Sequence, residues 1–165
     1  MKPWLSQGNE ERTAVIAIVV QEQFQDKVPE QTLCRAAESA LQISNVIDSP
    51  SLSIRITDDT EIQDLNLRFR GIDKTTDVLS FGEEFTDPDL KSRYLGDIVI
   101  SYPQAENQAN TRNHAATDEL QLLVIHGVLH LLGYDHGTED EKNDMWSLQG
   151  KILDQLGLSI QVEDM

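Results

Sequence analysis

The sequence predicts an α+β fold in which a small mixed four-stranded sheet packs with about five helices. Short β-branched or alternating segments typical of strands are followed by apolar residues at helical spacing. In residues 120–132 apolar positions recur with no clear polar face, so this helix is central and buried. We expect residues 1–165 to form one domain, with polar termini at 1–12 and 158–165.

Four strands are expected from β-branched composition and from alternation of apolar and polar residues. They lie at residues 13–20, 52–57, 77–81 and 95–101. The first is short and β-branched, so we expect it to be buried. The polar residues 83–92, which contain an Asp-Pro-Asp sequence, are expected to form a loop.

Helices are expected where starting residues precede apolar residues at helical spacing. The starting residues are Pro29, Asp58, Pro103, Thr117 and Thr138. A glutamate three residues after Asp58, and another three residues after Thr138, complete capping-box patterns. Glycines are expected to end three helices, at Gly71, Gly133 and Gly157.

Composition argues against several classes of protein. The formal net charge of −16 disfavours a broad nucleic-acid-binding surface, so DNA is not an expected partner, but it is compatible with a small basic patch. A single cysteine excludes a disulfide framework and a thiolate metal cluster. The apolar residues 15–20 are too few to span a bilayer. We therefore expect a soluble cytoplasmic protein with no membrane partner.

The most specific pattern is HxxxHxxGxxH, formed by His126, His130, Gly133 and His136. Histidines four residues apart lie on one face of a helix, and a glycine can end that helix so that the third histidine turns back. Three neutral imidazoles suit zinc and leave a fourth position for water or substrate. Nickel, iron or manganese also accept three nitrogens. A lone histidine in a core is usually structural, but three of the four histidines fall within these eleven residues.

The same spacing of histidines and glycine occurs in metzincin proteases, which need a glutamate directly after the first histidine as general base. Gly127 stands at that position, so peptide hydrolysis by the usual mechanism is disfavoured. Arg68, Arg70 and Lys74 form the densest basic cluster of the chain. A guanidinium there can bind a phosphodiester through two N–H groups, or it can simply complement the helix dipole.

Together these segments closely resemble the YbeY family of bacterial endoribonucleases. His126 to His136 matches the family's HGxLHLxGYDH motif, Leu65-Asn66 through Arg70 and residues 76–81 (TDVLSF) resemble a second block, and residues 95–101 (LGDIVIS) resemble a third. The resemblance covers roughly residues 50–156.

The resemblance implies a metal-dependent endoribonuclease specific for single-stranded RNA. Such enzymes mature the 3′ end of small-subunit ribosomal RNA and act in ribosome quality control, which makes the small subunit and its proteins expected partners. The three histidines correspond to the family's metal ligands, and Arg70 corresponds to its functional arginine.

Two further residues are candidates with open alternatives. His114 either lines the cleft or shuttles a proton, or is an ordinary loop histidine. Asp135 either orients an imidazole as an acceptor or caps the last helix. Two other functions also stay open: a metal-dependent hydrolase of peptides or small molecules, and a non-catalytic ribosome-assembly factor with a structural metal.

Overall fold

The computed structural model describes residues 15–46, 48–87 and 92–160. In chain order the elements are β1 (Val15–Val20), the 3-10 helix η1 (Glu22–Lys27), α1 (Glu30–Ile43), β2 (Ser51–Thr57), α2 (Asp59–Arg70), β3 (Val78–Asp87), β4 (Ser92–Ser101), α3 (Tyr102–Arg112), α4 (Ala116–Leu131) and α5 (Glu139–Gln155). The predicted α+β fold class is confirmed. None of the helices in these ranges is both long and apolar enough to cross a membrane.

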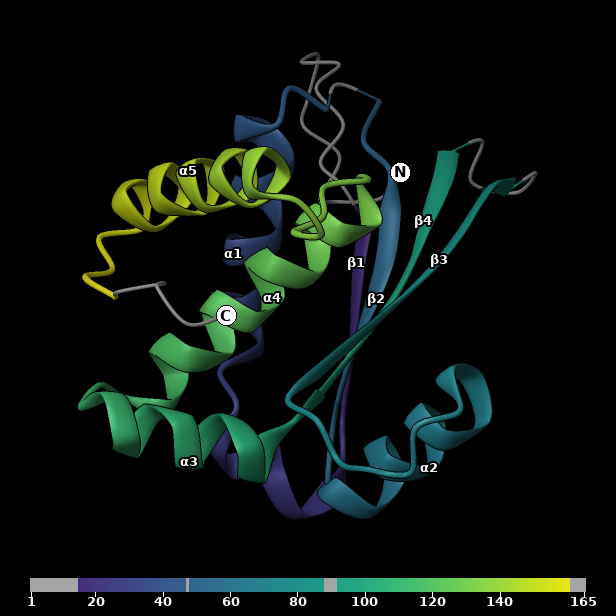
Figure 1. The fold of residues 1–165 in the computed structure, drawn as a ribbon, viewed down its shortest axis with the longest axis vertical. Helices are drawn as coiled ribbons and strands as arrows, with labels where there is room; N and C mark the ends of the chain where they lie inside the picture. Colours follow the sequence, from purple (N-terminus) through teal and green to yellow (C-terminus); the bar gives the residue numbers. More distant parts are fainter. Residues whose placement is uncertain (1–14, 47, 88–91, 161–165) are drawn as a thin grey trace, which may run out of the picture.

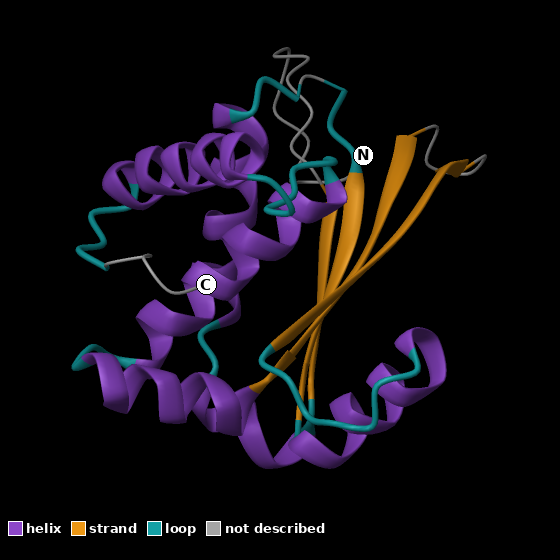
Figure 2. Cartoon of the chain, in the orientation of Figure 1, coloured by secondary structure: helices purple, strands orange, loops and turns teal. Residues whose placement is uncertain are grey.

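The four strands form one mixed sheet in the order β1-β2-β4-β3. β2 pairs in parallel with β1 and β4, and β3 pairs antiparallel with β4. Helices α1, α3, α4 and α5 lie on one side of the sheet, and α2 lies on the other (Figures 1 and 2). The sheet therefore has one thickly covered face and one thinly covered face.

Helix α4 is the centre of the covered layer, as its sequence predicts. Every residue from Glu119 to Leu129 is buried, and the helix contacts the sheet as well as α1, α3 and α5. Each fully buried leucine, isoleucine or valine side chain stabilises the fold by about 1.5–3 kcal/mol before losses of conformational entropy. This packing fixes the C-terminal turn of α4, which carries the first two histidines of the motif.

Local capping follows the sequence at two helices and departs from it at a third. The side chains of Asp58 and Thr138 accept the N–H groups of Glu61 (2.9 Å) and Glu141 (3.1 Å), as predicted. Thr117 was expected to cap α4, but Ala115 holds the N-cap position without a side-chain hydrogen bond. Ion pairs of Glu119 with Arg112 and His114 instead connect the start of α4 to the preceding helix and loop.

The expectation of a buried first strand is wrong. β1 is an edge strand whose outward residues Val15 and Val19 are each 53% exposed. The cause is topological, because the face of β1 turned away from α1 has no helix over it in the described part of the chain (Figure 1). A run of β-branched residues favours a strand, but it does not indicate whether one or both faces of that strand are covered by helices.

The expected loop at residues 83–92 is also wrong for much of its length. β3 continues to Asp87 and β4 begins at Ser92, with an irregularity in the pairing between Gly82 and Phe85. Antiparallel strands pair through backbone groups, so polar residues can extend the two strands beyond the core.

The two expected polar termini lie largely outside the described residues. Nothing in residues 1–12 is described, and the C-terminal segment is described only to residue 160. Within that part, Leu158 and Ile160 are half-buried and pack against the core. The segment therefore begins with apolar contacts before its polar end.

One close approach joins α4 to the sheet. A Cβ atom added at Gly127 would lie 2.8 Å from Cγ2 of Ile98, a fully buried residue of β4. The glycine thus allows the helix to lie directly on the strand, where no side chain fits.

We predict that Gly127→Ala lowers the free energy of unfolding by about 1–3 kcal/mol, because the new methyl group overpacks this contact. Gly150→Ala in α5 is the control: a Cβ there meets nothing within 4 Å, and alanine favours a helix by roughly 0.5–1 kcal/mol. Urea denaturation measures both. Equal stability of the Gly127 variant and the wild-type chain would contradict the close approach.

Candidate metal centre

The three motif histidines come together at the C-terminal end of α4. His126 and His130 are one turn apart, the helix ends at Leu131, and Gly133 takes a left-handed conformation with φ of +99°. The chain then reverses and returns His136 to the first two rings. One ring nitrogen from each histidine lies within 4.8 Å of the others, so the group can hold a metal ion.

Hydrogen bonds at the Nδ1 atoms determine which ring nitrogens face one another. Nδ1–H of His126 donates to Oε1 of Gln149 (2.7 Å), and Nδ1–H of His130 donates to the carbonyl of Tyr134 (3.0 Å). The Nε2 atoms of the two rings are 2.9 Å apart. Because each neutral ring has its proton on Nδ1, two lone pairs point at each other, and a shared cation satisfies both.

Burial keeps these histidines neutral. It lowers the pKa of His126 to about 4, and the neighbouring His130 adds to that effect. The pKa of His130 is also lowered, by burial first and by His136 second. Neutral imidazole is the form that binds a metal, so both rings can act as ligands at pH 7 without losing a proton.

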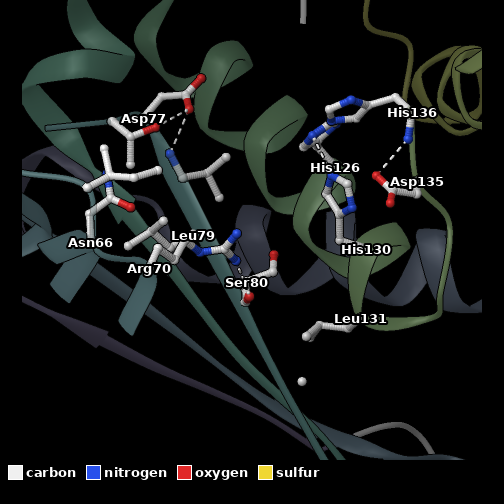
Figure 3. A pocket seen from close by; sticks show the side chains of 14 residues that line it. Asn66, Arg70, Asp77, Leu79, Ser80, His126, His130, Leu131, Asp135 and His136 are labelled. Carbon is white, nitrogen blue, oxygen red and sulfur yellow. Dashed lines mark hydrogen bonds between the residues drawn. The ribbon is translucent and has the colours of Figure 1, made fainter. Parts of the chain in front are cut away.

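The histidines form one wall of a cavity of about 590 Å³. The opposite wall comes from α2 and β3 (Figure 3). The polar residues that line the cavity as a whole, besides the histidines, are Asn66, Arg70, Thr76, Asp77, Ser80 and Asp135. The cavity thus has three histidine rings that could hold a metal ion on one side and a guanidinium on the other.

Arg70 ends α2 and points into this cavity (Figure 3). Its Nη2 donates to the carbonyl of Ser80 (2.9 Å), and its guanidinium lies 5.8 Å from the ring centroid of Phe81. The hydroxyl of Ser80 in turn donates to the carbonyl of Gly127 (3.3 Å), which links Arg70 to the helix of the histidines. Arg68, from the same basic cluster, pairs instead with Asp64 (3.3 Å).

His114 lies away from the cavity. Its Nε2–H donates to Oε1 of Glu119 (2.6 Å), while Nη1 of Arg112 lies 3.2 Å from Oε2 of the same carboxylate. Glu119 is fully buried, so its charge needs both partners. The contacts favour an anchoring role for this loop histidine.

Asp135 lines the cavity but caps no helix. Its Oδ1 accepts the backbone N–H of His136 (2.8 Å), which holds the third histidine's backbone in its turn. The cap of α5 is Thr138, so the capping alternative for Asp135 is wrong. Its negative charge acts to raise the pKa of His130, against the larger effect of burial.

Sequence reasoning missed Gln149 and Asp77. Gln149 is fully buried on α5 and contacts His126, which lies 23 residues earlier in the sequence. A signal was present: it is a polar residue between Met145 and Ile152, on the apolar face of the predicted helix. Asp77 is the second residue of the TDVLSF segment and lines the cavity. Its carboxylate accepts hydrogen bonds from Val78 N (2.7 Å) and Gln108 Nε2 (3.1 Å).

Two imidazoles on a buried helix and a third from the turn after it face a guanidinium across a cavity, which defines a site able to hold a metal ion and suited to an anionic substrate. A family model described as endoribonuclease YbeY matches residues 17–157. The chain belongs to this YbeY family of endoribonucleases.

Individual relatives agree. The endoribonuclease YbeY of Brevibacillus brevis is 39% identical over 146 residues, which cover 81% of this chain and 91% of that protein. The endoribonuclease YbeY of Roseiflexus castenholzii is 47% identical over 131 residues, or 76% and 82% of the two chains. The solution structure of TM1509 from Thermotoga maritima matches with a TM-score of 0.56 and 26% identity, over 87% of this chain and 92% of that one.

The placement of His114 leads to a prediction. We expect His114→Ala to lower the free energy of unfolding by about 1–3 kcal/mol, because buried Glu119 loses a hydrogen-bond donor. The bound metal per chain should stay the same. Urea denaturation and metal analysis measure the two effects, and loss of metal with unchanged stability would instead put His114 at the metal centre.

Proposed function

We propose that this chain is a zinc-dependent endoribonuclease that cleaves single-stranded RNA. Its substrate is small-subunit ribosomal RNA in the cytoplasm, with the small subunit and its proteins as partners, and residues 1–165 act as one domain. The observation that carries the proposal is a three-histidine cluster facing Arg70 in one cavity. The endoribonuclease names of its relatives support the reaction class.

His126, His130 and His136 are the residues that would hold the zinc ion. The donor set fits, because three imidazole nitrogens and one open position are typical of catalytic zinc sites. When bound, zinc supplies a Lewis acid for a phosphoryl oxygen and acidifies water. The half-buried wall of histidines fixes the ligands, while the cavity beside them gives the substrate room.

Arg70 is proposed to bind the scissile phosphodiester. Its contact with the Ser80 carbonyl orients the guanidinium, and a planar guanidinium can donate two parallel hydrogen bonds to a phosphate. It is the single arginine or lysine among the described residues that line the cavity. In a chain with a net charge of −16, this local charge gives few phosphate contacts, so binding of bare RNA should depend weakly on salt.

Proteolysis fits the site poorly. A zincin-type glutamate at position 127 would bring its Cβ within 2.8 Å of Ile98. The packing of α4 on β4 therefore leaves no space for the general base of that mechanism.

To test the metal centre, His126 and His130 are each replaced by alanine. We expect both variants to lose bound zinc and cleavage of single-stranded RNA together. His114→Ala, which changes the one histidine outside the motif, is the control and should keep both zinc and RNA cleavage. Undiminished zinc and cleavage in the first two variants would refute the proposed site.

Charge reversal at Arg70 tests the substrate site separately. Arg70→Glu should lower kcat/KM for RNA by about 100-fold while leaving zinc content intact, because a charged donor to the phosphodiester is lost. Arg68→Glu, two residues away and outside the cavity lining, makes the same change of charge and should have a much smaller effect. Equal losses in the two variants would indicate general electrostatics rather than a phosphate contact.

A further inference from the structure

Helix α5 supplies a second layer of contacts around the histidines. The ring of Trp146 meets the rings of His126 and His136 edge-on, at centroid distances of 6.0 and 5.6 Å. One turn further on, Gln149 is fully buried and places Oε1 2.7 Å from Nδ1 of His126. The helix thus presents an aromatic wall and one polar group to the cluster.

The orientation of the Gln149 amide decides where the proton of His126 sits. With Oε1 toward the ring, Nδ1 must carry the proton, and the lone pair of Nε2 is free. With the NH₂ group toward the ring, the proton would move to Nε2. It would then point at Nε2 of His130, only 2.9 Å away, and block the position that a cation needs.

The other ring of the pair needs no such side chain. Nδ1 of His130 donates to the backbone carbonyl of Tyr134, an acceptor that cannot reverse its role. Gln149, by contrast, is an amide that can present either a donor or an acceptor. Its Nε2 is buried without a hydrogen-bond partner among the described residues, so no bond of Nε2 competes with the contact between Oε1 and His126.

That buried amide nitrogen is costly. An unsatisfied buried donor destabilises a fold, and a leucine or methionine of similar size would avoid this. The neighbours of Gln149 on the same helix face, Met145 and Ile152, are apolar and fully buried. A glutamine at this position therefore points to a role that packing alone does not supply.

We propose that Gln149 is a positioning residue for the metal centre: by accepting from Nδ1–H, it holds His126 in the tautomer that presents Nε2 to the ion. The proposal rests on the metal-binding function proposed for the three histidines. Its consequence is that a side chain which touches neither metal nor substrate sets the affinity for zinc.

The test compares three full-length variants in a zinc competition assay against a chromophoric chelator. Gln149→Leu should bind zinc about 10–100-fold more weakly, the usual effect of removing an acceptor behind a ligand histidine. Gln149→Glu keeps an acceptor at the same distance and should bind at least as tightly as the wild-type chain. Gln121→Leu is the matched control: it removes another buried glutamine of the central layer, whose Nε2 donates to the carbonyl of Thr117 (3.2 Å), and should leave the affinity unchanged.

A second readout needs no metal. Long-range ¹H–¹⁵N NMR spectra of the metal-free chain should show His126 protonated at Nδ1 in the wild-type and Gln149→Glu chains, and a mixture of tautomers in Gln149→Leu. A Gln149→Leu variant with wild-type zinc affinity and an unchanged tautomer would overturn the inference. Failure of the wild-type chain itself to bind zinc would instead refute the proposed function, so the two failures are distinguishable.

Discussion

The contact between α4 and β4 at Gly127 and Ile98 is the constraint on which the rest of the site depends. Because Gly127 has no side chain to separate helix from strand, α4 lies directly against the sheet. Its C-terminal part therefore lies next to β3. Ser80 of β3 then bonds to the Gly127 carbonyl on one side and to Arg70 on the other. One close approach therefore sets the spacing between the guanidinium and the histidines across the cavity.

Two ring nitrogens of the histidine cluster repel each other through their lone pairs, and a cation between them would remove this repulsion. His126 and His130 are held with facing Nε2 lone pairs 2.9 Å apart, and burial together with their mutual repulsion opposes protonation of either ring. The bonds of their Nδ1 atoms to Oε1 of Gln149 and to the Tyr134 carbonyl oppose a change of tautomer. A positive ion between the two Nε2 atoms would stabilise this arrangement.

What the sequence predicts well is what short-range physics determines. Helical spacing puts His126 and His130 on one face, and the left-handed Gly133 brings the chain back to His136, so this group needs no tertiary information. Gln149 needs such information, because its partner lies 23 residues away on another helix. The exposed face of β1 was missed for the same reason, since strand order decides which strand lies at an edge.

Hydrogen bonds fix the positions of the cavity's two carboxylates. Asp77 accepts from the Val78 N–H and from Gln108, and Asp135 accepts from the His136 N–H. Among the described lining residues, the groups best matched to a phosphodiester are electrophilic: the guanidinium of Arg70 and the three histidines, which could hold an ion. In the proposed reaction, such a site would lower the barrier mainly by stabilising negative charge as it develops on the phosphate, through charged groups that the fold has already placed.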